Sequence, residues 1–145
     1  MFHRILALTV IALLTASLTA CGPGKITDED VRVVTAESVA AAIGNNDVKL
    51  IDVRSPDRFA AGHIPGAINI FTPDITHNDS RLINASRIIV YADGGAARLA
   101  TGAAKRLIAL RYKKVDEFRG GILEWTETGR QIITSSTADS ARPER

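Results

Sequence analysis

One glycine-rich loop carries the residues best suited to chemistry, because it follows the strongest predicted strand of the chain, residues 87–91. In open parallel sheets, ligands bind beyond the carboxyl ends of strands, which is where this loop begins. Its glycines let several N–H groups point inward, and the next helix adds a partial positive charge at its N-terminus. Arg98 adds a cation, whereas Asp93 opposes an anion if its side chain turns inward. We expect a modest anion cradle; the alternative is an ordinary turn with Arg98 in solvent. The residues of this 92–98 loop are Ala92, Asp93, Gly94, Gly95, Ala96, Ala97 and Arg98.

Strand and helix patterns alternate along the chain on both sides of this loop. Residues 49–53 and 87–91 are compact apolar runs, typical of strands buried on both faces. Residues 96–110 are rich in alanine, with leucines at nearly helical spacing. The alternation predicts an α/β fold with a mainly parallel sheet. We expect strands at 31–34, 49–53, 67–70, 87–91 and 115–118, helices at 36–43, 55–62, 96–110 and 120–129, and an irregular segment at 71–86.

Residues 1–20 are typical of a secretory signal peptide, with a short basic start, an apolar run and then small residues. The run is too short for a comfortable membrane span, which needs about 20 residues. The stretch Leu18-Thr19-Ala20-Cys21 resembles the lipobox of bacterial lipoproteins, which implies cleavage before Cys21 and lipid attachment to its sulfur. Two or three acyl chains give stable anchoring. The alternatives are a buried N-terminal helix and a free Cys21.

Length and composition limit the classes of protein to which this chain can belong. Its 145 residues suit one domain, and 46% hydrophobic with 23% charged residues exclude wholesale disorder. A net charge of +2 without a long basic run gives no support for nucleic-acid binding. A single cysteine excludes a disulfide framework and a cysteine-cluster metal site. We divide the chain into a signal peptide (1–20), a tether (21–31), a domain (32–133) and a disordered tail (134–145).

Three segments of the chain together resemble the rhodanese-like domain family. They are LIDVRSP at 50–56, FAAGHIPGAINI at 59–70 and FRGGILEW at 118–125. The resemblance implies a five-stranded, mainly parallel sheet with helices on both faces. In the enzymes of this family, a cysteine at the start of the loop after the central strand attacks a sulfur donor. That cysteine holds the sulfur as a persulfide and passes it to a nucleophile.

The resemblance places Ala92 where those enzymes have the cysteine. A methyl group can neither attack a sulfur donor nor hold a persulfide. The loop contains no serine or threonine that could replace the cysteine. The lipobox resemblance implies that the sulfur of Cys21 carries a lipid, which would leave no free thiol there. The loop also departs from the family in length, because five residues (93–97) separate Ala92 from Arg98, one more than in the usual sulfurtransferase loop. That count resembles the related phosphatases, although the two adjacent glycines can be aligned either way.

For the other residues singled out in the sequence, we expect structural roles or surface positions rather than chemistry. The resemblance implies a hydrogen-bonding or packing role for four of them, Asp52, Arg54, His63 and Trp125. Arg58 stands where family enzymes often have an acidic residue, and we expect this exchange to be a surface change. His63 and His77 have no acidic or thiol ligand close by, so no metal site is expected.

These observations predict a membrane-anchored, extracytoplasmic rhodanese-like domain that has lost sulfurtransferase chemistry. We expect it to bind a small anion in the 92–98 loop, or an unidentified envelope protein over the same face. Lipidated Cys21 would hold it to a bacterial membrane, on the periplasmic side in a Gram-negative cell. Two alternatives stay open: a sulfurtransferase that uses an external thiol, and a structural scaffold in an envelope complex. No cofactor and no nucleic acid are expected.

Overall fold

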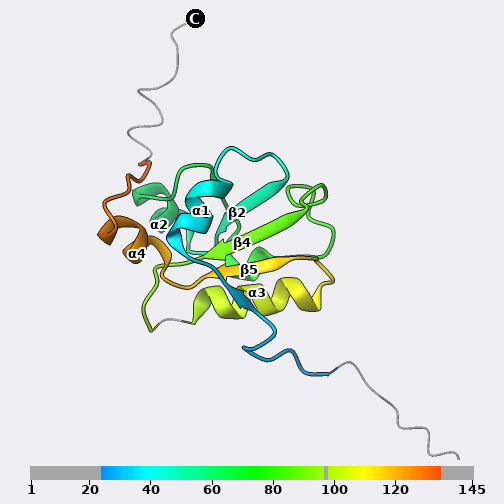
Figure 1. Ribbon diagram of the computed structural model, residues 1–145. Coiled ribbons are helices and arrows are strands. Elements are labelled where there is room, and N and C mark those ends of the chain that lie inside the picture. The colour runs from blue at the N-terminus through cyan, green and yellow to red at the C-terminus, as the bar shows by residue number, and fades with distance from the viewer. Residues whose placement is uncertain (1–23, 97, 135–145) are drawn as a thin grey trace, which may run out of the picture.

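Strands and helices alternate along the chain, as predicted, in the computed structural model, which describes residues 24–96 and 98–134 (Figure 1). The predicted signal peptide, Cys21, Ala97 and the predicted tail beyond residue 134 lie outside the described residues. The elements are β1 (Arg32–Val33), α1 (Ala36–Ala42), β2 (Val48–Asp52), α2 (Pro56–Ala61), β3 (Ala67–Asn69), the 3-10 turn η1 (Thr72–Asp74), β4 (Arg87–Tyr91), α3 (Leu99–Ala109), β5 (Val115–Phe118) and α4 (Gly121–Glu127).

In the described part of the chain, five strands form one sheet in the order β1-β5-β4-β2-β3, with β4 at its centre. Every pairing in it is parallel. This confirms the predicted fold class, an α/β domain with a five-stranded parallel sheet flanked by helices. Because parallel strands end at the same edge, the loops that follow β2 and β4 leave the sheet side by side.

Alternate residues of β4 pack against opposite faces of the sheet. Ile88 and Val90 belong to the core cluster that includes α3, whereas Ile89 and Tyr91 belong to the cluster with α1 and α4. Figure 1 shows the same division, with α3 on one face and α1 and α4 on the other. Both faces are buried, which explains why the sequence of this strand is a continuous apolar run. Within the described ranges, the members of both clusters lie between residues 31 and 132.

The largest difference from the sequence prediction is the start of α3, at Leu99 rather than residue 96. Gly94 and Gly95 have φ values of 98° and 69°. These are left-handed conformations, which cannot be continued directly into a right-handed helix. The turn therefore extends further along the chain than the alanine-rich pattern indicated. The other predicted bounds differ from the observed ones by at most two residues, which is ordinary for element ends.

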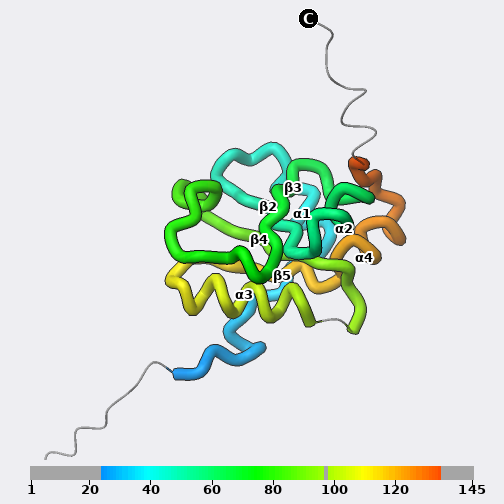
Figure 2. Tube along the Cα trace, turned by 180° about the vertical axis from the view of Figure 1, so that it is seen from behind, coloured from blue at the N-terminus to red at the C-terminus, as the bar shows by residue number. Residues whose placement is uncertain are grey.

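The two ends of the described chain lie on different sides of the domain (Figure 2). The residues from 24 onward lie beside α3, and those before 134 lie beside α2 and α4. An antiparallel bridge holds the latter segment, in which His63 and Ile133 exchange N–H···O bonds of 2.9 Å. None of the helices in the described ranges combines the length and the apolar character that a bilayer span requires.

Candidate functional site

The candidate site lies where the segments that follow β2 and β4 run side by side. Asp52 at the end of β2 pairs with Tyr91 at the end of β4. The contact continues past the strands, because the N–H of Val53 donates to the carbonyl of Tyr91 at 3.1 Å. Arg54 and α2 follow on one side, and the 92–98 loop begins on the other. The parallel register therefore brings together two segments that are far apart in the sequence.

A buried carboxylate fixes the guanidinium of Arg54. Asp52 is fully buried, and the side chain of Arg54 is only 6% exposed. Nε of Arg54 donates to Oδ1 of Asp52 at 3.0 Å and Nη2 donates to Oδ2 at 2.6 Å, the two-pronged geometry typical of arginine with a carboxylate. Nη2 also donates to the carbonyl of Gly62 at 2.6 Å. These bonds hold Arg54 in one orientation, with Nη1 directed toward the 92–98 loop.

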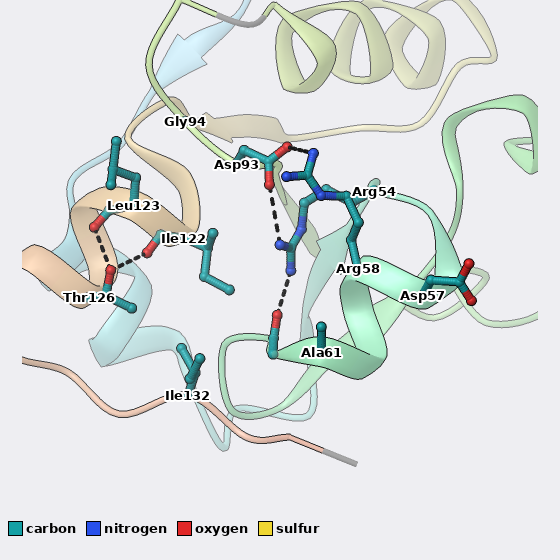
Figure 3. A pocket seen from close by; sticks show the side chains of 11 residues that line it. Arg54, Asp57, Arg58, Ala61, Asp93, Gly94, Ile122, Leu123, Thr126 and Ile132 are labelled. Atoms are coloured by element: carbon teal, nitrogen blue, oxygen red, sulfur yellow. Dashed lines mark hydrogen bonds and ion pairs between the residues drawn. The ribbon is translucent and has the colours of Figure 1, made fainter.

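The carboxylate of Asp93 turns inward and lies between two guanidinium groups (Figure 3). Nη1 of Arg54 donates to its Oδ1 at 3.3 Å, and Nη1 of Arg58 donates to its Oδ2 at 2.7 Å. The side chain of Asp93 is 32% exposed and that of Arg58 is 64% exposed. Arg58, expected from the sequence to be a surface change, therefore contributes a charge to the site. Each carboxylate oxygen of Asp93 is bound by a different arginine.

Burial and neighbouring charges shift the pKa values of Arg54 and Tyr91. Burial disfavours the charge of Arg54, but the carboxylate of Asp52 outweighs it and raises the pKa of that guanidinium. Burial also raises the pKa of the Tyr91 phenol, and the negative charge of Asp52 adds to the effect. The phenol accepts a hydrogen bond from the N–H of Ile64 at 3.0 Å. The Arg54 side chain therefore stays positively charged, and the Tyr91 phenol stays neutral.

The beginning of the 92–98 loop is packed tightly against the turn that opens α4. The N–H groups of Ile122 and Leu123 donate to the carbonyls of Ala92 and Asp93, each at 3.0 Å. Gly121 has φ of 60°, and a Cβ at this position would lie 2.3 Å from the carbonyl oxygen of Ala92. Only glycine fits this close approach. The Gly120-Gly121 pair therefore holds the backbone of Ala92 and Asp93 in place.

A cavity of about 600 Å³ opens beside Asp93. One side is charged, with the two arginines, and the other side is apolar, with side chains of α4 and of the carboxyl-terminal segment (Figure 3). This volume is ordinary for a small-molecule pocket, which spans about 300–1,000 Å³. The lining residues are Arg54, Asp57, Arg58, Ala61, Gly62, Asp93, Gly94, Ile122, Leu123, Thr126 and Ile132.

Only some of the described residues of the 92–98 loop line this cavity. Asp93 and Gly94 line the cavity. Ala92 is 2% exposed and packs within the core cluster on the α3 face. Arg98 is exposed and forms an ion pair with Asp28, which also pairs with Lys105. The cation expected from Arg98 is instead supplied to the cavity by Arg54 and Arg58, which follow another strand.

The remaining residues of the family motifs contact the protein itself. Nδ1 of His63 lies 2.9 Å from the carbonyl of Phe59, and the two rings stack with their centroids 3.8 Å apart. Trp125 is buried, and its Nε1 donates to the carbonyl of Gln131 at 2.8 Å. The side-chain amide of Asn69 donates to the carbonyl of Asp52 at 2.9 Å. These contacts hold α2, α4 and the carboxyl-terminal segment around the cavity.

The cavity beside Asp93 can attract a negatively charged group. Its charged side offers two guanidinium groups, which recognise carboxylate and oxyanion groups well. The hydroxyl of Thr126 donates to the carbonyls of Ile122 and Leu123, at 3.0 and 2.8 Å, so it is engaged with backbone. Within residues 24–96 and 98–134, no three His, Cys, Asp or Glu side chains gather as a metal site would require.

The fold and site together define a class: a small parallel α/β domain with a cavity at the carboxyl ends of two neighbouring strands, β2 and β4. A sequence model of the rhodanese-like domain matches residues 35–128, which is more than half of the chain. The chain belongs to the rhodanese-like domain family.

The chain is also similar in sequence to curated proteins and in structure to solved ones. A sulfurtransferase of Allochromatium vinosum is 29% identical over 104 residues, covering 71% of this chain and 95% of that protein. An HTH-type transcriptional regulator of Mycobacterium tuberculosis is 34% identical over 85 residues, which are 57% of this chain but only 36% of the regulator. The crystal structure of the BH2092 protein from Bacillus halodurans superposes with a TM-score of 0.64 at 26% identity, covering 79% of this chain and 87% of that one.

Proposed function

We propose that this rhodanese-like domain binds an anionic group and does not transfer sulfur. The observation that carries the proposal is the carboxylate of Asp93, held between Arg54 and Arg58 beside the cavity. The protein's own side chain thereby marks where a negative group is stabilised. Arg54 is fixed by Asp52 before any ligand arrives, so it loses little conformational freedom on binding.

The residue at the start of the 92–98 loop supports the absence of sulfur transfer. Persulfide chemistry needs a thiolate, and Ala92 provides only a methyl group. Its burial within the α3-side core gives an external thiol little room to replace it. The second candidate, a sulfurtransferase that uses an external thiol, is favoured by the named sulfurtransferase that matches most of this chain. Thiocyanate formation with and without an added thiol separates the two.

We further propose that Cys21 is lipidated and anchors the domain to the outer face of a bacterial cytoplasmic membrane or to the periplasmic face of an outer membrane. The support is the signal-type run of residues 1–20 followed by the lipobox-like stretch. Residues 24–30 lie beside α3 (Figure 2), so an anchor at Cys21 would hold the domain from that side. Cys21→Ala should move the protein from the membrane fraction to the soluble fraction. Unchanged membrane association would count against the anchor.

Anion binding can be measured by calorimetric titration and thermal shift, using residues 22–145 with acetate, sulfate, phosphate and thiosulfate. A ligand at 100 times its dissociation constant adds about 2.7 kcal/mol to stability. Arg58→Gln should abolish the shift, because it removes one of the two guanidinium groups. Arg32→Gln is the matched control, since Arg32 is similarly exposed at 66% and also pairs with an aspartate, Asp116. Loss of binding in the Arg32 variant alone, or no binding of any anion by the unaltered protein, would contradict the proposal.

A further inference from the structure

We infer that the ligand is a carboxylate carrying a short apolar chain, and that it binds by displacing the carboxylate of Asp93 from Arg54 and Arg58. This inference rests on the proposed function and deepens it, because it names both the ligand class and a competitor within the protein.

Displacement follows from the way in which Asp93 occupies the charged side of the cavity. Its two oxygens already accept from Nη1 of Arg54 and Nη1 of Arg58. A ligand anion placed beside it would meet a like charge at close range, which is unfavourable. The hold on Asp93 is weak, however. The contact to Arg54 is 3.3 Å long, and the contact to Arg58 involves a side chain that is 64% exposed. Asp93, itself one-third exposed, can turn into water and leave the arginines free.

The geometry of the pair favours a carboxylate as the replacing group. Oδ1 of Asp93 faces Arg54 and Oδ2 faces Arg58, so a planar group with two oxygens bridges both guanidinium groups. A ligand carboxylate in the same place would reproduce both hydrogen bonds. The other carboxylate of the lining, Asp57, points away from Asp93 and Ile122 in Figure 3. It therefore does not block the position between the arginines.

The opposite side of the cavity favours an apolar chain on that carboxylate. Ile122, Leu123 and Ile132 line it, and the side chain of Thr126 presents its methyl group because its hydroxyl is bonded to backbone. Leu123 is 50% exposed, which leaves apolar surface for a ligand to cover. A cavity of about 600 Å³ is far larger than an inorganic anion, which is comparable in size to one or two waters of about 30 Å³ each.

The test compares hexanoate with acetate, sulfate and the neutral hexanamide by calorimetric titration of residues 22–145. Hexanoate should bind at least about tenfold more tightly than acetate, because its extra methylenes bury apolar surface. Hexanamide should bind at least about tenfold more weakly than hexanoate, because it lacks the charge. Asp93→Asn should tighten hexanoate binding about three- to tenfold by removing the competing ion pairs. Glu127→Gln also removes one negative charge, but from an exposed side chain of α4 that does not line the cavity, and should change the affinity less than twofold.

The outcomes separate this inference from the proposed function. If sulfate or acetate binds as tightly as hexanoate, the ligand class is wrong while anion binding stands. If Asp93→Asn leaves hexanoate affinity unchanged in a protein with an unaltered amide spectrum, displacement is wrong. Asp93→Ser provides the same comparison should the asparagine variant fold poorly. If no anion binds any variant, both the inference and the proposed function fall.

Discussion

Asp93 and Arg58 are 35 residues apart in the sequence, and their side chains meet at 2.7 Å across the mouth of the cavity. The pair exists because β2 and β4 are neighbours in the sheet and end at the same edge. It places a carboxylate at the start of the loop in which the family's enzymes generate a thiolate. The negative charge of Asp93 should therefore lower the reactivity of a cysteine introduced at position 92.

Ala92→Cys in residues 22–145 introduces the only thiol of that chain, and we expect the neighbouring Asp93 to suppress its reactivity. A nearby negative charge disfavours the thiolate and so raises the pKa of the thiol. Position 92 is buried, so both variants should react slowly with iodoacetamide, and the readout is the ratio of their rates. The double variant Ala92→Cys with Asp93→Asn should react about three- to tenfold faster at neutral pH than the single variant. Equal alkylation rates in the two folded variants would show that Asp93 does not act on this position.

The buried ion pair of Asp52 and Arg54 should contribute far more to stability than a similarly spaced pair whose guanidinium group is about half-exposed. Asp52→Asn removes the partner of a buried guanidinium and should lower the free energy of unfolding by about 3 kcal/mol. The control is Asp79→Asn, because Asp79 and Arg81 have the same two-residue spacing and Arg81 is 47% exposed. Its cost should be about 1 kcal/mol or less, since Arg81 can return to water. Urea denaturation measures both values, and similar costs would refute the role given to Asp52.

Alanine should have opposite effects at Gly121 and at Gly102, because a Cβ has no room at the first position and open space at the second. Gly121→Ala places a methyl group 2.3 Å from a backbone oxygen at a φ of 60°, and should destabilise the fold by about 3 kcal/mol. Gly102→Ala lies within α3 where a Cβ meets nothing within 4 Å, and should stabilise it by about 0.5–1 kcal/mol. Thermal denaturation of the two variants tests this. Tolerance of alanine at position 121 would mean that the loop and α4 are not in tight contact.

Stability should fall below about pH 4 because of Asp116. Burial opposes the ionisation of this carboxyl, but Arg32 and Arg87 outweigh burial and hold its pKa below the ordinary value of 3.8. Nε of each arginine donates to it, at 2.7 and 2.6 Å. Because the folded-state pKa is depressed, the stabilisation is fully present above the unfolded value and is lost as the pH falls through the folded value.

The check on Asp116 is the free energy of unfolding measured from about pH 5 to about pH 2. Asp116→Asn should be less stable than the unaltered protein at pH 5 and should show a shallower decline toward low pH. Glu127→Gln, which alters an exposed carboxyl on α4, serves as the control. Parallel declines for the unaltered protein and the Asp116 variant would rule out this contribution.

The sequence predicted the fold well because the signals for it are local. The apolar run of β4, the alternation of strands and helices, and the glycine-bearing motifs each define an element or a turn. The charges at the cavity were harder to predict, because their partners lie far away in the chain. Arg98 pairs with Asp28, 70 residues before it, and Arg58 pairs with Asp93 only through the register of the sheet. The available signal was the basic residue at position 58, where the family is often acidic, together with an acidic residue in the loop.

Whether the domain transfers sulfur is measured by thiocyanate formation from thiosulfate and cyanide, with and without an added thiol such as dithiothreitol. We predict that the rate equals that of the protein-free mixture in both cases, while hexanoate titration of the same preparation shows binding that Arg58→Gln abolishes. Thiocyanate production that increases with protein concentration, or a sulfur adduct on the polypeptide after exposure to thiosulfate, would contradict it.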